Sequence, residues 1–155
     1  MSVLRERPYT NFNFLVDLGD GSTDGPQAGF EEVILPEIWL DVIEYRNGNE
    51  KENSVRKLTG LDHVGNAVLK RGVIGSLNLY QWYNDIRNGN QNALRNVMIH
   101  LQSEDHSAIV QTWKLLRARV IGLKWGPLQA KSKDVAVEYV VLACERLEME
   151  SPGNL

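Results

Sequence analysis

Apolar and polar residues alternate along much of the chain, and this pattern predicts a mainly β protein. In the first such segment, Asn11 to Leu18, the side chains of Phe12, Phe14, Val16 and Leu18 share one face. Further strand-like segments are Phe30 to Leu35, Ile38 to Tyr45, Ala67 to Val73, Val97 to Leu101, Ala108 to Leu116 and Val135 to Cys144. The turn at 103–107 predicts a hairpin between Val97 to Leu101 and Ala108 to Leu116.

Two segments near the C-terminus depart from simple alternation. We expect the stretch 117–130 to be broken by Gly122 and by Gly126-Pro127. In the last strand, Glu138, Val140 and Leu142 oppose the face of Tyr139, and the middle of the strand is apolar on both faces. Both faces of this middle part are therefore expected to be covered, one of them by the helix or by another chain.

One segment follows a helical period. Leu79, Trp82, Tyr83 and Ile86 recur at the spacing of one helix face, which predicts an α-helix at about residues 76–87. Ser76 fits the position of an N-cap, and Gly89 fits a C-terminal stop. A helix of about 11 residues is marginal alone in water, so its apolar stripe is expected to dock on the sheet.

The segment 46–57 is almost wholly polar and opens with Asn47-Gly48, a tight-turn signal. It lies between two strand patterns and is too long for a plain hairpin turn. A mobile loop and an extended hairpin both fit it.

The composition is ordinary for a single globular domain, which is expected to span residues 1–155. It has 155 residues and a formal net charge of −3, which gives no sign of nucleic-acid binding. No apolar run reaches the roughly 20 residues that span a bilayer, and Met1 to Arg7 lacks the apolar stretch of a signal peptide. Synthesis in the cytoplasm is therefore expected, and Cys144 is expected to be a small buried residue.

Sequence signals for metal-binding, catalytic or nucleic-acid-binding residues are weak throughout the chain. Asp20, Ser22, Asp24, Gly25 and Glu31 fit a calcium-loop spacing, but no helix follows them, and such residues also build ordinary turns. The histidines, His63, His100 and His106, lack a third convergent ligand. We therefore expect no metal site, no cofactor and no catalytic residue. Lys70-Arg71 and Arg117-Ala118-Arg119 favour local salt bridges over a nucleic-acid surface. The four tryptophans, Trp39, Trp82, Trp113 and Trp125, favour core or subunit contacts.

An ordered set of short motifs resembles the tube subunit of contractile phage tails and contractile injection systems. In order, the motifs are Pro8 to Phe14, Gly29 to Val33, Ile43 to Asn49, Lys57 to Gly60, Leu69 to Val73, Leu79 to Tyr83, Trp113, Gly126 to Ala130 and Asp134 to Glu138. They cover nearly the whole chain. The sequence departs from the family at Ile34 to Glu37, at Arg119 to Ile121 and in the charges Glu50 to Glu52.

The resemblance implies an antiparallel β-sandwich or barrel with one flanking helix, as in the type VI secretion tube protein. Six copies would close a ring, and rings would stack into a hollow tube inside a sheath. The residues 46–66 would form the extended contact between rings. The stacking residues would be Arg46, Asn47, Asn49, Glu50, Lys51, Glu52, Arg56 and Lys57, and the outer helix face, Asn78, Gln81, Asp85 and Arg87, would meet the sheath.

Partners implied by the resemblance are further copies of the chain, sheath, baseplate and spike proteins, tape-measure and terminator or cap proteins, and cargo in the lumen. Membrane insertion is not expected. Assembly would take place in the cytoplasm, and the product would be an extracellular or cell-attached particle, or a virion. A tube-initiator subunit on the baseplate is the alternative within the family. A monomeric ligand-binding or enzymatic β-barrel is the alternative outside it.

Overall fold

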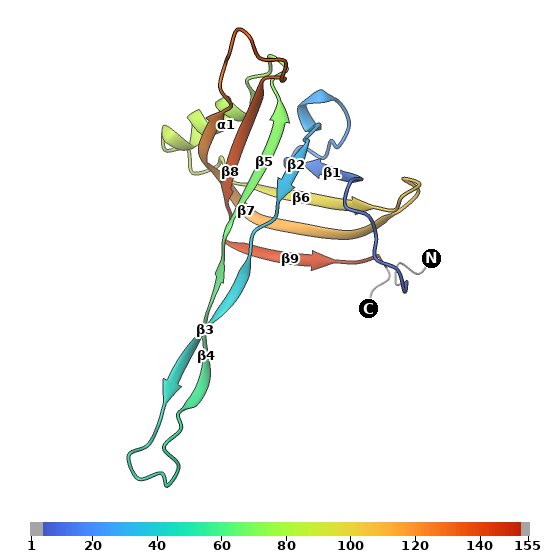
Figure 1. Ribbon diagram of the computed structural model, residues 1–155. Helices are drawn as coiled ribbons and strands as arrows, with labels where there is room; N and C mark the ends of the chain where they lie inside the picture. Colours follow the sequence, from blue (N-terminus) through green and yellow to red (C-terminus); the bar gives the residue numbers. More distant parts are fainter. Residues whose placement is uncertain (1–4, 153–155) are drawn as a thin grey trace.

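Two β-layers joined by one long strand form the body of the protein (Figure 1). The computed structural model describes residues 5–152. Residues 1–4, part of the N-terminal stretch in which no signal peptide is expected, and residues 153–155 lie outside the described residues. The elements are β1 (Phe14–Asp17), β2 (Glu32–Ile34), β3 (Ile38–Tyr45), β4 (Arg56–Val64), β5 (Asn66–Gly72), α1 (Asn78–Arg87), β6 (Arg95–Gln102), β7 (Ile109–Trp125), β8 (Val137–Ala143) and β9 (Arg146–Glu150), with a 3-10 turn, η1, at Pro26–Ala28.

The strand order in the seven-stranded sheet is β1-β6-β7-β8-β5-β2, with β9 also paired to β7, and every pair is antiparallel. The first part of β7 pairs with β6 and β9, whereas Arg119 to Trp125 pairs with β8. Strand β7 therefore belongs to both layers. The described sheet ends at β1 and β2 and does not close into a barrel, so the chain has the predicted antiparallel β architecture in an open form.

The core lies between the two layers and under the helix. It contains buried aliphatic residues from β1, β5, β6, β7 and β8, among them Val16, Leu69, Val97, Leu115, Val120, Val140 and Leu142. Burying each such side chain contributes about 1.5–3 kcal/mol. Along β8, Glu138, Val140 and Leu142 are buried, whereas Val137, Tyr139 and Val141 on the opposite face are half-buried. The alternation predicted these two faces, but it did not predict that the face carrying the polar Glu138 is the buried one. Cys144 is also buried, as expected, and burial raises the pKa of its thiol.

The prediction that Gly122 breaks a strand is wrong. Strand β7 continues through Gly122 and ends at Trp125, directly before Gly126-Pro127. The register of β7 on β8 shifts between Val120 and Gly122, so the glycine lies at a bulge in a continuous strand.

Other boundaries also differ from the prediction. Strand β1 begins at Phe14, and Phe12 is 66% exposed although it follows the same alternation as Phe14. Strand β9 was missed, because three of its five residues are charged. Its Leu147 nevertheless packs against the core, and alternation with Met149 was the available signal.

Strands β3 and β4 form a separate two-stranded hairpin that projects away from the body (Figure 1). The segment 35–37 connects it to β2, and Gly65 connects it to β5. The Gly65 N–H donates a 2.7 Å hydrogen bond to the Glu37 carbonyl oxygen at this junction. The hairpin is therefore anchored in the layer of β5 and β8. Within residues 5–152, no helix has the length and apolar character needed to cross a bilayer.

Candidate assembly surfaces

The projecting hairpin carries apolar side chains on both of its faces. Alternation along β3 places Ile38, Leu40 and Val42 on one face and Trp39, Ile43 and Tyr45 on the other. These six side chains are between 45% and 61% exposed. A two-stranded hairpin is marginal by itself in water, so these faces are suited to contact with other protein surfaces.

Specific contacts fix the hairpin's shape along its length. The rings of Trp39 and His63 stack with centroids 5.3 Å apart, and His63 Nε2 lies 2.7 Å from Asp41 Oδ2. Opposite them, a Cβ on Gly60 would lie 3.0 Å from the Asp41 Cβ and 3.3 Å from the Ile43 Cδ1. The glycine therefore allows the two strands to approach closely, beside the bulge at which the register of β3 on β4 shifts between Leu40 and Val42.

The tip of the hairpin, residues 46–55, is held by Arg46. Its Nε donates to the Glu52 carbonyl oxygen and its Nη2 to the Glu50 carbonyl oxygen, both at 2.9 Å. The Glu50 carboxylate pairs with Arg56 at 3.2 Å. Arg46 and Glu50 are thus half-buried, and the other residues predicted to stack, Asn47, Asn49, Lys51, Glu52, Arg56 and Lys57, are exposed.

The helix packs its predicted stripe on the body. Leu79 and Trp82 are 2% and 1% exposed, and the half-buried Tyr83 and Ile86 pack against the core. Trp82 Nε1 donates a 2.6 Å hydrogen bond to the Ala93 carbonyl oxygen. An apolar stripe alone could not have predicted that bond.

The ends of the helix differ in part from the prediction. Its N-cap is Leu77, not Ser76, although the Ser76 hydroxyl accepts a 3.3 Å hydrogen bond from the Asn78 N–H. At the other end, Gly89 has φ +83° and its N–H donates to the Ile86 carbonyl oxygen at 3.0 Å. The positive φ explains why a glycine ends the helix.

The outer face of the helix is smaller than the sequence suggested. Gln81, Asp85 and Arg87 are exposed, but Asn78 is half-buried and its Oδ1 accepts a 2.6 Å hydrogen bond from Arg71 Nη2. The assignment of Asn78 to the outer face is corrected by this contact.

A buried cation ties several segments together. Arg71 is 1% exposed, and its Nε donates to Glu138 Oε1 at 2.5 Å. Its Nη1 donates to the Gln27 carbonyl oxygen at 2.8 Å, and its Nη2 reaches Asn78 at the start of α1. One guanidinium therefore joins β5, β8, η1 and the helix.

The other candidate charges also form local contacts. Lys70 lies 3.6 Å from Glu31, whose carboxylate raises the pKa of the lysine. Arg117 and Arg119 both pair with Glu145, at 3.3 Å and 3.0 Å. The basic pairs are thus salt-bridged, as predicted.

The residues that match the spacing of a calcium loop form the hydrogen bonds of ordinary turns. Asp20 Oδ1 accepts from the Ser22 N–H at 3.0 Å, and the Ser22 hydroxyl donates to the Asp24 carbonyl oxygen at 3.3 Å. In the part of the chain that the structure describes, no three His, Cys, Asp or Glu side chains converge on a point that could hold a metal. The side chain of His100 also makes a local contact, because its Nδ1 lies 2.8 Å from the Thr112 hydroxyl.

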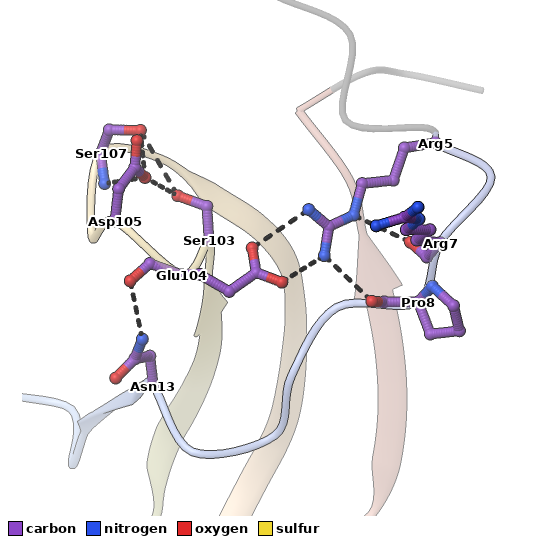
Figure 2. A network of polar contacts seen from close by, with 8 residues as sticks. All are labelled: Arg5, Arg7, Pro8, Asn13, Ser103, Glu104, Asp105 and Ser107. Atoms are coloured by element: carbon purple, nitrogen blue, oxygen red, sulfur yellow. Dashed lines mark hydrogen bonds and ion pairs between the residues drawn. The ribbon is translucent and has the colours of Figure 1, made fainter.

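The N-terminal segment is pinned by a network that sequence reasoning missed (Figure 2). The Arg5 guanidinium pairs with the Glu104 carboxylate and donates to the Pro8 carbonyl oxygen at 3.0 Å. Asn13 Nδ2 donates to the Glu104 carbonyl oxygen at 3.3 Å. The hydrogen bonds from Arg5 lower the pKa of Glu104. These partners are 99 residues apart in sequence, so no local pattern signals the contact.

Among residues 5–152, four strand edges of the seven-stranded sheet have no strand paired to them. They are the outer edges of β1, β2 and β9, and the edge of the second half of β7 that faces away from β8. Unpaired edges present backbone donors and acceptors to other chains. The fold therefore offers both an apolar hairpin and open edges for self-assembly.

Comparison with known proteins is consistent with these surfaces. A family model described as "T4-like virus tail tube protein gp19" matches residues 10–148. A search of characterised protein sequences finds no significant match.

Solved structures share the fold over nearly all of the chain. A chain of an extracellular contractile injection system, the PVC sheath–tube complex in its extended state, is 28% identical with a TM-score of 0.81, covering 94% of this chain and 93% of that one. A chain of the anti-feeding prophage tube-terminating cap is 26% identical with a TM-score of 0.81, covering 97% and 96%. A type six secretion system protein is 13% identical with a TM-score of 0.54, covering 91% and 84%, and shows the shared fold alone.

Proposed function

The chain belongs to the tail tube protein family of T4-like viruses, and on that premise we propose that it is the repeating subunit of an inner tube. Six copies close a ring, and rings stack head to tail into a hollow tube within a contractile sheath. The particle is an injection system or a phage tail that delivers cargo into a target. The protein acts by polymerising, and we assign it no catalytic role.

The observation that carries this proposal is the hairpin β3–β4. It projects from the body with six apolar side chains about half exposed on its two faces. Exposed apolar surface on that scale costs free energy in an isolated chain. This free energy is recovered when the surface is buried between copies. A contact made by one end of a molecule on a different surface of the next is heterologous, and its repetition gives a filament.

Open strand edges support ring closure. The layer formed by β7, β8, β5 and β2 ends in unpaired edges at β2 and at the second half of β7. Pairing these edges between neighbours would join the layers of six copies into one continuous barrel with a channel. Ring closure thus uses the body, and stacking uses the hairpin.

Further partners follow from this assembly. Sheath protein would surround the tube and meet the outer face of α1, at Gln81, Asp85 and Arg87. Baseplate and spike proteins would hold its first ring, a terminator or cap protein its last ring, and a tape-measure protein would occupy the lumen during assembly. Assembly would take place in the cytoplasm before the particle leaves the cell or attaches to it.

The mass of the purified protein in solution tests ring formation. A ring of six 17.5 kDa chains has a mass of about 105 kDa, and light scattering after size exclusion should detect it at high concentration. Deleting residues 50–54 should then leave rings but prevent tubes, because the hairpin tip is lost and the body is intact. A compact monomer at every concentration would disprove the tube subunit, and normal tubes from the deletion would disprove the hairpin's role.

The alternative within the family is a tube-initiator subunit that forms the first ring on the baseplate. Such a subunit would close rings but would not stack on itself. Long tubes grown from the purified chain alone would therefore favour the repeating subunit.

A further inference from the structure

Strand β7 ends in a tryptophan that its own chain leaves half exposed. Trp125 is 54% exposed, although it lies on the face of its layer that elsewhere forms the core. We infer that Trp125 of one copy inserts into an apolar cleft between β1 and β2 of a second copy. The inference rests on the proposed function, because it names the side chain that anchors one copy to the next within a ring.

The register of β7 on β8 shows to which side Trp125 points. Trp125 lies directly opposite the buried Glu138, so its side chain is on the core side of the layer. Lys124 lies opposite Tyr139 on the other side, where its ammonium is 5.9 Å from the centroid of the tyrosine ring. The edge of β7 therefore presents an aromatic side chain on one face and a cation on the other.

Backbone pairing holds this strand end in place. The Gly126 N–H donates a 3.1 Å hydrogen bond to the Val137 carbonyl oxygen, which continues the pairing of β7 with β8 past Trp125. A Cβ on Gly126 would lie 2.8 Å from the Val137 Cγ2, so only glycine fits there without displacement of a neighbour. An anchor that is positioned before binding loses less entropy on association.

The cleft that we assign to Trp125 has a volume of about 440 Å³ and opens between the two layers. Its walls are mainly apolar and include Phe12, Phe14, Val33, Leu35, Leu101 and Trp113. A cleft of this size and character accepts an aromatic side chain. Asn11 and Glu32 also line it, and their oxygens are acceptors of the kind that a buried indole N–H requires.

Pairing of the β7 edge with the β2 edge of another copy would bring Trp125 to this cleft. Residues directly opposite each other in a sheet point to the same face, so Trp125 would lie on the core side of β2. Val33 is the residue of β2 on that side, since it packs against the core and lines the cleft. Strand directions alternate across β7, β8, β5 and β2, so rotation about a ring axis places β2 antiparallel to the next β7.

Charge favours contact between these two surfaces. Residues 8–45, which contain β1 and β2, include eight acidic residues and no lysine or arginine. Residues 106–133, which contain β7, include six lysine and arginine residues and no acidic residue. Glu31 and Glu32 are exposed beside the cleft, and Lys124 is exposed on β7. The edge of β2 therefore attracts the edge of β7 from another copy.

The same charges disfavour symmetric pairs. Two β2 edges would bring together the carboxylates of Glu31 and Glu32 from both copies, and two β7 edges would bring together their Lys124 side chains. Like-charge contacts across an interface suppress such pairings. A symmetric pair also stops at two copies and leaves either the cleft or Trp125 without an occupant. Pairing of β7 with β2 fills the cleft, buries Trp125 and leaves one edge of each kind for the next copy.

Two variants that each lose one half of the contact test the inference. Trp125→Asp removes the inserted side chain, and Phe12→Asp places a carboxylate in the cleft at a residue that is 66% exposed in the single chain. Leu128→Asp is the matched control, because Leu128 is an 86% exposed apolar residue near Trp125 that does not line the cleft. Circular dichroism verifies folding, and light scattering after size exclusion measures the mass.

Each of the two variants alone should remain a monomer, and the control should form rings like the unmodified protein. An equimolar mixture of the two variants should form a dimer of two 17.5 kDa chains, about 35 kDa. In that dimer the intact tryptophan of one chain meets the intact cleft of the other, and neither chain can add a third. Rings from either variant alone, or a mixture that stays monomeric, would overturn the inference.

Photo-cross-linking locates the contact independently, also in case Trp125→Asp does not fold. The photoreactive amino acid p-benzoylphenylalanine replaces Trp125, and mass spectrometry identifies the residues to which it is joined in rings. The expected product links position 125 of one chain to residues that line the cleft of another. Rings whose cross-links lie at any other segment would overturn the inference. Failure of the unmodified protein to form any ring would instead overturn the proposed function itself.

Discussion

Trp82 Nε1 donates a 2.6 Å hydrogen bond to the carbonyl oxygen of Ala93, and this bond joins α1 to the segment that leads into β6. The indole is 1% exposed, and the Arg95 guanidinium lies 4.5 Å from its ring centroid. Trp82 thus fills the space under the helix and also satisfies a buried backbone acceptor. The helix is held in one position on the body by both effects.

Replacing Trp82 by alanine should destabilise the protein by about 3–5 kcal/mol, the usual cost of removing a buried aromatic side chain. Soluble rings should be lost with it. Trp82→Phe retains an aromatic ring but leaves the Ala93 carbonyl without its partner, so it should cost about 1–3 kcal/mol. Urea unfolding measures both values, and a harmless Trp82→Ala would show that the helix does not depend on this contact.

The buried pair of Arg71 and Glu138 gives a second prediction. Arg71→Met or Glu138→Leu alone leaves one buried charge without its partner and should cost about 3–5 kcal/mol. The double variant removes both charges and should cost less than the two single changes added together. Denaturant unfolding of the four proteins forms a double-mutant cycle; strictly additive costs would mean that the two groups do not interact.

The N-terminal segment should detach at low pH. Because Arg5 holds the pKa of Glu104 below its ordinary value of 4.5, the carboxylate's contribution is complete above that value. It is lost as the pH falls through the lower pKa of the folded state. The Asp105 carboxyl, whose pKa is also lowered by Ser103 and Ser107, acts in the same direction.

Amide NMR at Thr10, whose backbone contributes a hydrogen bond to Glu104, should follow this detachment. Glu104→Gln is the matched control, since it cannot titrate and should release the segment at neutral pH. A Thr10 signal unchanged across the acid range in the unmodified protein would contradict the role assigned to Figure 2's network.

The outer face of α1 gives a prediction about the sheath. Reversing Asp85 and Arg87 together should leave rings and tubes intact, because both side chains are exposed. It should weaken co-assembly with the sheath protein, which sedimentation of tubes mixed with sheath can measure. The Gln81→Ala variant is a milder change on the same face. Undiminished sheath assembly on the reversed tubes would assign the sheath contact to another surface.

Sequence patterns predicted those parts of the fold in which buried and exposed positions recur at a fixed period. The stripe of Leu79 and Trp82 followed from periodicity alone, and so did the division of β8 into two faces, although periodicity did not show which face is buried. Ends of elements were less predictable, because Gly122 can occupy a bulge as readily as a break. The charged strand β9 was missed since its apolar residues are only two.

Contacts between distant segments were beyond such reasoning. Neither the Arg5–Glu104 pair nor the bond from Trp82 to Ala93 leaves a periodic trace in the sequence. Asn78 was placed on the outer face by helical spacing, but the buried Arg71 draws it inward. Long-range polar partners depend on the tertiary arrangement, which single-sequence patterns do not encode.

Cryo-electron microscopy of the purified chain at high concentration tests the central claim most directly. The account predicts hollow tubes of stacked six-membered rings, with the β3–β4 hairpin of each copy buried against the next ring. Compact monomers, or rings in which the hairpins remain exposed and no stacking occurs, would contradict it.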